Sequence, residues 1–74
     1  MRAVDSNGTS LEIGDIVYFR SWVGHPFNYV GVVKSSIIIE NGVDIMYREG
    51  LLGKFPENIR KMSDEEALLW KLEN

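Results

Sequence analysis

The sequence predicts a mainly β domain, a small five-stranded barrel with a short α-helix at its C-terminal end. Short β-branched segments of alternating polarity are separated by glycine-containing turns, and the last residues change to a helical pattern. The chain has 74 residues, of which 45% are hydrophobic, so it forms one domain near the lower size limit for a self-sufficient core. We divide it into a flexible N-terminal segment (1–10), the barrel (11–62) and a helix packed on the barrel (63–74).

Two strands are expected in the first half of the chain. Residues 14–20 alternate, with Val17 and Phe19 on one face, which is the period of a strand. Residues 29–39 are rich in β-branched side chains and predict one long strand. Gly31 inside it marks a bulge or a bend.

A hairpin is expected at Asn41-Gly42, because a type I′ turn needs positive φ at both central positions. A two-residue turn there pairs Ile38 with Ile45, and directly paired residues share a face. The residues expected inside the barrel are Ile38, Val43, Ile45 and Tyr47. The residues expected to form an outward apolar cluster are Ile37, Ile39 and Met46. Glu49-Gly50 then turns the chain into a short strand, residues 51–55.

Pro56 ends that strand, because proline has no N–H to offer the ladder and suits the first position of a helical turn. Residues 56–59 therefore predict one 3₁₀ turn. Residues 59–62 predict a last short strand, which pairs with the first strand and closes the barrel.

The C-terminal helix is expected over about 64–72. Ser63 is its N-cap, and Glu66, three residues later, completes a capping box. A helix this short needs tertiary contact to persist. Its stripe of Leu68, Leu69 and Leu72 predicts that it packs on the outward apolar cluster of the barrel. The competing interpretation makes that cluster a partner or dimer surface and docks the helix elsewhere.

The residues that carry a family resemblance lie between Gly14 and Met62. "YREGLLGKFPENIRKM" resembles the closing half of Src-homology-3-like small barrels of the Tudor-like kind, and "GDIVYF" followed by "VGVV" resembles the opening half of the KOW motif. Small proteins of bacteria and their phages often have this pattern. The resemblance implies a small barrel that binds a partner, and it does not distinguish among the functions that share this fold. The loop after the first strand, residues 21–28, lacks the basic residues of RNA-binding KOW segments.

The composition excludes several classes of protein. With no cysteine and one histidine, we expect no disulfide, no metal site and no cofactor. The N-terminus has no signal-peptide core and no apolar run reaches membrane length, so a soluble cytoplasmic protein without membrane contact is expected. The net charge of −3 argues against a dedicated nucleic-acid binder, although residues 16–62 carry six basic against four acidic side chains.

Aromatic residues are the candidates for binding another protein, because aromatic side chains are enriched at interfaces and can hold cations. The candidate partner-binding residues are Tyr18, Trp22, His25, Phe27, Tyr29 and Tyr47. Loop 21–28 is either a lid over one barrel end or a binding site; we favour the lid for Phe27 and leave Trp22 open. The candidate phosphate contacts are Arg48, Lys54, Arg60 and Lys61.

No group of residues predicts catalysis. "GLLGK" lacks the spacing and the final Ser or Thr of a phosphate loop, and His25 has no acid or nucleophile at informative spacing. We therefore expect a non-enzymatic module that mediates protein–protein interaction. The alternatives are a KOW-like nucleic-acid-associated domain and a small structural subunit of a larger assembly, such as a phage particle.

Overall fold

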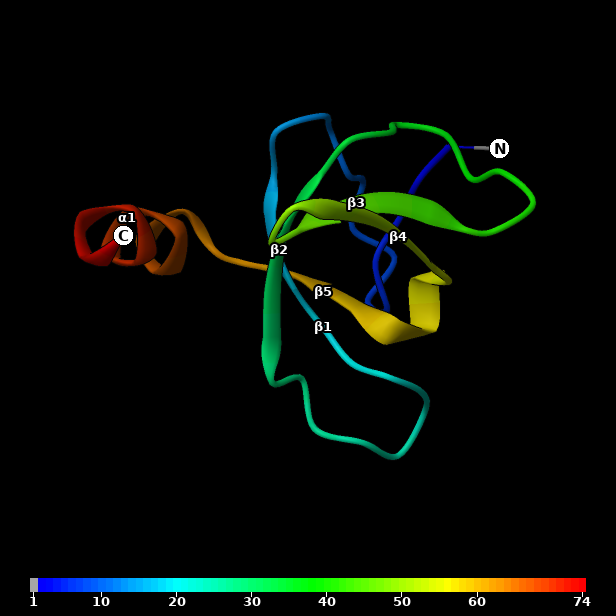
Figure 1. The fold of residues 1–74 in the computed structure, drawn as a ribbon, viewed down its shortest axis with the longest axis horizontal. Helices are drawn as coiled ribbons and strands as arrows, with labels where there is room; N and C mark the ends of the chain where they lie inside the picture. Colours follow the sequence, from blue (N-terminus) through cyan, green and yellow to red (C-terminus); the bar gives the residue numbers. More distant parts are fainter. Residues whose placement is uncertain (1) are drawn as a thin grey trace.

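The computed structural model describes residues 2–74, which form one five-stranded antiparallel sheet and a C-terminal α-helix (Figure 1). The strands are β1 (Ile16–Phe19), β2 (Tyr29–Val33), β3 (Val43–Tyr47), β4 (Gly50–Lys54) and β5 (Ile59–Lys61). A 3₁₀ turn, η1 (Pro56–Asn58), precedes β5, and the helix α1 spans Asp64–Glu73. The mainly β class, the five strands, the 3₁₀ turn and the helix are confirmed.

The order of the strands is β4-β3-β2-β1-β5, so β4 and β5 lie at the two edges of an open sheet. The predicted pairing of the last strand with the first is confirmed, with Tyr18 opposite Arg60 and Phe19 opposite Ile59. Within residues 2–74 no ladder joins β4 to β5. The short turn η1 connects the two edges covalently.

The long strand predicted over residues 29–39 is wrong, because β2 ends at Val33. The following segment leaves the sheet, and Ile37 forms a bridge with Arg2 of the N-terminal segment. The hairpin register is also wrong: Val33 pairs with Ile45, and the turn is closed by Ile39 and Gly42. The sequence of the hairpin alone could not predict this register, because the bridge that competes with it is formed by Arg2, which is distant in the sequence.

No bulge occurs at Gly31, where the β1–β2 ladder continues without an extra residue. A Cβ atom at this position would meet the Ile45 side chain, and it would lie 2.9 Å from the carbonyl oxygen of Met46 and 3.1 Å from the Phe19 ring. Glycine is therefore required here by the packing of the core.

The core lies on the inner face of the curled sheet. It contains Ala3, Leu11, Val17, Phe19, Val33, Val43, Ile45 and Ile59, with Ile38 and Tyr47 packed against it. The predicted interior positions in the hairpin are thus confirmed in spite of the wrong register. Ala3 is only 1% exposed, so the core extends into the N-terminal segment that the sequence suggests is flexible.

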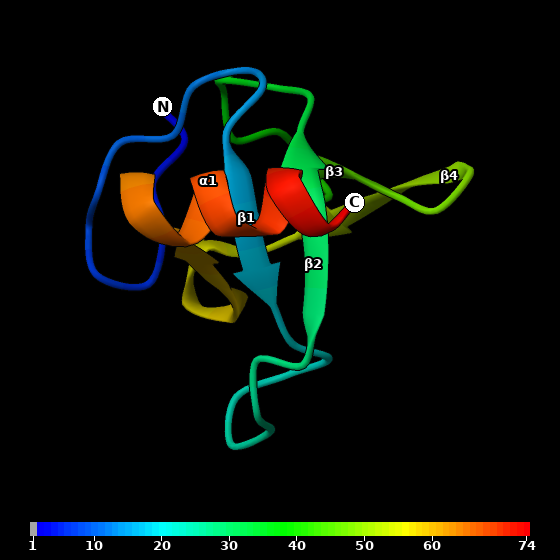
Figure 2. The ribbon, with the colours of Figure 1, turned by 90° about the vertical axis from the view of Figure 1, so that its left-hand side faces the viewer.

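The helix α1 crosses the outer side of β1 and β2 (Figure 2). Its capping box is confirmed: the Ser63 hydroxyl accepts from the Glu66 N–H, and the Glu66 carboxylate accepts from the Ser63 N–H. The predicted docking through the leucine stripe is wrong. Leu68, Leu69 and Leu72 are more than half exposed, as is Ile37 of the cluster they were expected to cover. No helix among the described residues is long and apolar enough to cross a membrane.

Candidate functional site

Three aromatic rings meet at one end of the sheet. Phe19 closes β1 and Tyr29 opens β2 directly opposite it, and their rings stack with centroids 5.4 Å apart. Tyr47, at the end of β3, meets both rings edge-on, at 5.2 Å from Phe19 and 5.6 Å from Tyr29. Because the rings fill the space between them, these three side chains do not surround an empty cage for a cation.

The buried member of this group fixes the exposed ones. Phe19 is 2% exposed, whereas Tyr47 is half-buried and Tyr29 is 39% exposed. A tyrosine that stacks on a buried ring has little rotamer freedom left to lose when it binds a partner. The two tyrosines are therefore held in place where they reach the surface.

Leucine and lysine side chains of β4 extend this surface. Leu52 pairs with Ile45 and Lys54 pairs with Val43, both core residues, so Leu52 and Lys54 share the inner face of the sheet. Lys54 Nζ lies 5.7 Å from the centroid of the Phe19 ring. We call Tyr29, Tyr47, Leu52 and Lys54, which all lie on the inner face of the sheet, the mouth surface.

The loop of residues 21–28 does not join the mouth surface. Trp22 is 63% exposed, and its indole N–H donates to His25 Nε2 at 2.6 Å. The Phe27 ring lies under the guanidinium group of Arg20, and the guanidinium carbon is 4.4 Å from the ring centroid. Neither Trp22 nor Phe27 belongs to the core cluster, so the lid interpretation, favoured for Phe27, finds no support in the packing.

Tyr18 points to the opposite, outer face of the sheet. The Arg60 guanidinium carbon lies 4.5 Å from its ring centroid, and the Tyr18 hydroxyl donates to Glu66 Oε2 of α1 at 3.1 Å. The backbone hydrogen bond from Ser63 lowers the pKa of Glu66, and the Tyr18 hydroxyl lowers it further. Burial raises the pKa of Tyr18, and its hydrogen bond to Glu66 adds to the rise.

A groove of about 260 Å³ lies between α1 and the sheet. Its lining residues are Tyr18, Val30, Met62, Glu66, Leu69, Trp70 and Glu73. Trp70 is half-buried here and is the largest side chain of α1 that lines the groove.

The four candidate phosphate contacts do not form one patch. The Arg48 guanidinium carbon lies 5.3 Å from the centroid of the Tyr47 ring, so Arg48 lies beside the mouth surface, of which Lys54 is a member. Arg60 stacks on Tyr18 on the other face, and Lys61 Nζ forms an ion pair with Asp15 at 3.4 Å. A nucleic acid following one path would therefore meet two of these cations at most.

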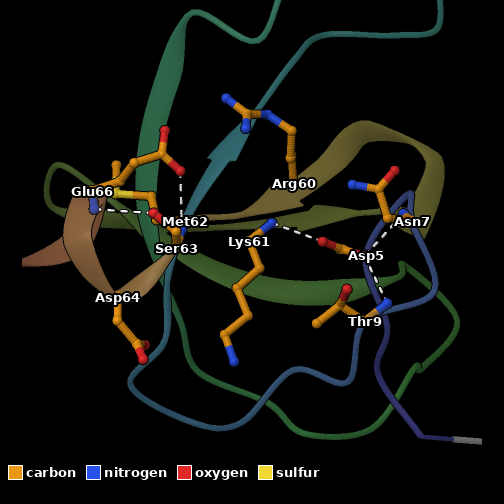
Figure 3. A pocket seen from close by; sticks show the side chains of 9 residues that line it. All are labelled: Asp5, Asn7, Thr9, Arg60, Lys61, Met62, Ser63, Asp64 and Glu66. Carbon is orange, nitrogen blue, oxygen red and sulfur yellow. Dashed lines mark hydrogen bonds between the residues drawn. The ribbon is translucent and has the colours of Figure 1, made fainter.

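A second, polar groove of about 450 Å³ lies between the N-terminal segment, β5 and the start of α1 (Figure 3). Its lining residues are Asp5, Asn7, Thr9, Arg60, Lys61, Met62, Ser63, Asp64 and Glu66. Asp5 is 4% exposed, and its carboxylate accepts from the backbone N–H groups of Asn7, Thr9 and Lys61, at 2.8–2.9 Å. These bonds give Asp5 a structural role. No group of three or more potential metal ligands occurs in the described part of the chain.

Comparison with known proteins identifies no relative of this chain. No family model matches it, and neither does any curated protein or solved structure. Its function therefore has to be inferred from the geometry of its surfaces.

Sequence reasoning named Tyr29 and Tyr47 but missed Leu52 and Asp5. The pairing of Leu52 with Ile45 depends on the register between β3 and β4. The sequence predicts a turn at Glu49-Gly50, which is one residue too late. The observed turn is Arg48-Glu49, between the paired residues Tyr47 and Gly50. Asp5 could have been found, since an aspartate shortly before Asn-Gly often accepts hydrogen bonds from the following turn.

Proposed function

We propose that this chain is a non-enzymatic protein-binding module built on a Src-homology-3-like small barrel, and that its mouth surface binds an extended segment of a protein partner. The observation that carries the proposal is the aromatic group: Tyr29 and Tyr47 are held by the buried Phe19 while Tyr29 keeps 39% of its surface exposed. Rigid aromatic side chains beside a cation are typical of binding hot spots.

The curvature of the sheet supports the barrel. Lys54 belongs to β4 and Phe19 to β1, three places apart in the strand order, yet the Lys54 ammonium group lies over the Phe19 ring. The inner face of β4 therefore turns back toward β1. The short turn η1 holds the ends of β4 and β5 near each other, as the closing half of such barrels requires.

The absence of enzymatic activity is also part of this proposal. His25, the single histidine of the chain, lies in an exposed loop, and its Nε2 atom accepts a hydrogen bond from Trp22. The carboxylate of Asp5 is occupied by three backbone donors. General acid–base chemistry needs a titratable group within reach of a bound substrate, and these two groups are engaged elsewhere.

A random-peptide display library, selected on the full chain, tests the proposal. We expect enriched peptides whose affinity falls at least about tenfold, or about 1.4 kcal/mol, in Tyr29→Ala and in Lys54→Gln. Trp22→Ala removes an exposed aromatic ring away from the mouth surface and is the matched control. Peptides that bind Tyr29→Ala and the unmodified chain equally well would exclude the mouth surface.

A specific observation keeps nucleic acid as the second candidate: the Arg48 guanidinium lies beside the Tyr47 ring of the mouth surface, and the Lys54 ammonium group lies over the buried Phe19 ring. Two phosphate contacts give a log–log salt dependence of about −1.4 to −1.8. Titration of labelled single-stranded RNA and DNA at several salt concentrations measures this slope. Tight binding with such a slope or a steeper one, weakened in Lys54→Gln, would favour the KOW-like alternative.

A further inference from the structure

The two edges of the sheet differ in how they are covered. On β5 the Ser6 N–H donates to the Ile59 carbonyl oxygen at 2.7 Å, and the Lys61 N–H donates to Asp5 Oδ2 at 2.9 Å. The N-terminal segment thus occupies the open side of β5. In the described part of the chain no hydrogen bond reaches the backbone of Leu51 or Gly53 from outside the β3–β4 pair.

The two-residue turn between β3 and β4 decides which backbone groups point outward. It makes Tyr47 and Gly50 a hydrogen-bonded pair, and antiparallel ladders alternate between bonded and non-bonded pairs. Leu52 and Lys54 therefore bond to β3. The N–H and C=O groups of Leu51 and Gly53 are directed away from the sheet, at an edge where a further strand can pair.

The side chains of β4 do little to block such pairing. Natural edge strands are usually protected by charges, prolines or bulges, but no charged residue, proline or bulge occurs between Gly50 and Gly53. Leu51 is 57% exposed and Leu52 38% exposed, on opposite faces of the strand. A strand added here would find an apolar side chain on each face.

We propose that β4 pairs with β4 of a second copy of this chain, in an antiparallel arrangement about a twofold axis at Leu52. A twofold axis places one residue opposite itself. With Leu52 on the axis, Leu51 lies opposite Gly53 of the other copy, and each such pair exchanges two backbone hydrogen bonds. This register gives a hydrogen-bond partner to all four outward backbone groups of Leu51 and Gly53. With the axis at Leu51 instead, Gly53 would lie opposite the β3–β4 turn of the other copy, and its backbone groups would not be paired with a strand.

The charges at the two ends of β4 also favour pairing with a second copy of this chain. Glu49 precedes the strand and Lys54 ends it, with no charge between them. Antiparallel pairing brings Glu49 of one copy next to Lys54 of the other, at both ends of the shared ladder. Opposite charges near each other across strands stabilise the pair, whereas a parallel arrangement would place like charges together.

The size of this contact determines its strength. Pairing of two five-residue strands is smaller than the interfaces of stable complexes, so the dimer is weak and reversible. It does not depend on peptide binding by the mouth surface.

Molar mass measured from micromolar to millimolar concentration tests the pairing. We expect the mass of the unmodified chain to rise from 8.4 kDa toward twice that value. Leu51→Pro removes one outward N–H without breaking a bond to β3, so this variant stays monomeric. Leu51→Val retains the N–H and associates. An unmodified chain that stays at the monomer mass, or a Leu51→Pro chain that associates like Leu51→Val, overturns the proposal.

A second pair of variants decides the matter if Leu51→Pro does not fold. Leu52→Lys and Leu52→Glu each place like charges opposite each other across the twofold axis, so each alone stays at the monomer mass. Mixing them places a lysine opposite a glutamate, and the mass of the mixture rises. A mixture that remains at the monomer mass refutes the twofold register.

Discussion

Asp5 and Lys61 are separated by 56 positions in the sequence and joined by a hydrogen bond of 2.9 Å, from the Lys61 backbone N–H to Asp5 Oδ2. The other carboxylate oxygen of Asp5 accepts from the N–H groups of Asn7 and Thr9. One buried carboxylate thus shapes the N-terminal turn and attaches it to the edge of β5.

Asp5→Ala removes this carboxylate and leaves three backbone donors without their partner. An unsatisfied buried donor costs about 1–3 kcal/mol, and water can reach part of this turn, so we expect a loss of about 2–4 kcal/mol of unfolding free energy. Urea denaturation followed by circular dichroism measures it. Ser6→Ala, a neighbouring exposed position whose backbone bond survives, is the control; equal losses in both variants would contradict the role of the carboxylate.

Gly31→Ala tests the tight packing of the core. The added methyl group would overlap the Ile45 side chain and lie 2.9 Å from the Met46 carbonyl oxygen. Overpacking of this kind costs about 1–3 kcal/mol, which in a domain of this size lowers the melting temperature by at least about 4 °C. Gly50→Ala, where nothing lies within 4 Å of the added carbon, should change the melting temperature little. A Gly31→Ala chain as stable as Gly50→Ala would show that the sheet relaxes around the methyl group.

The sequence predicted the local features of this fold better than its long-range ones. The 3₁₀ turn that begins at Pro56, the capping box at Ser63 and the strand alternation around Val17 each depend on a few neighbouring residues, and each was predicted correctly. The hairpin failed because Ser36 and Ile37 pair with the N-terminal segment instead, through the bridge of Arg2 with Ile37 and the hydrogen bond from the Ala3 N–H to the Ser36 carbonyl oxygen. The local sequence pattern of the hairpin does not include these distant residues.

The sequence predicted which types of residue form the candidate site, but it did not predict which of them lie together. Tyr29 and Tyr47 were both named, but their contact through Phe19 depends on the curl of the sheet. The same argument from residue type included Tyr18 with them, although the alternation of β1 places Tyr18 on the outer face, where it contacts Arg60 and Glu66. Proximity across a sheet follows from register and curvature, which side-chain chemistry alone does not determine.

Arg48 holds a backbone conformation that favours glycine. It is the non-glycine residue with positive φ in the described chain, at φ 56°, in the turn between β3 and β4. A left-handed backbone conformation costs a residue with a Cβ atom about 1 kcal/mol. Replacement by glycine removes this cost, but glycine also has more conformational freedom in the unfolded state, which offsets part of the gain. We expect Arg48→Gly to raise the unfolding free energy by up to about 0.5–1 kcal/mol. Glu49→Gly, in the same turn without positive φ, should not stabilise; a gain in Glu49→Gly as large as in Arg48→Gly would argue against strain at residue 48.

The hydrogen bond between Tyr18 and Glu66 makes the docking of α1 depend on pH. Because the pKa of Glu66 is lowered in the folded chain, its contribution is present at neutral pH and is lost as the pH falls through that lowered value. Because the pKa of Tyr18 is raised, its contribution is complete below the ordinary tyrosine pKa and is lost as the pH rises through the raised value. We expect α1 to loosen at both extremes.

Fluorescence of Trp70 reports this loosening, in a Trp22→Phe background where Trp70 is the remaining tryptophan. Tyr18→Phe should abolish the alkaline change. It should keep most of the acidic one, since the Ser63 backbone bond is the larger cause of the lowered pKa of Glu66. An alkaline change that persists unaltered in Tyr18→Phe would assign it to another group.

The docking of α1 itself depends on one side chain more than on its leucines. Trp70 is half-buried in the groove beside Tyr18 and Val30, whereas Leu72 is 75% exposed. Trp70→Ala should cost about 1–2 kcal/mol of unfolding free energy, less than the 3–5 kcal/mol typical of a fully buried ring. Leu72→Ala should stay within about 0.5 kcal/mol of the unmodified chain, as exposed substitutions do. Chemical denaturation of both variants compares them directly. If Leu72→Ala proves as costly as Trp70→Ala, the leucine stripe contacts the sheet in solution and α1 docks by the face that the sequence first indicated.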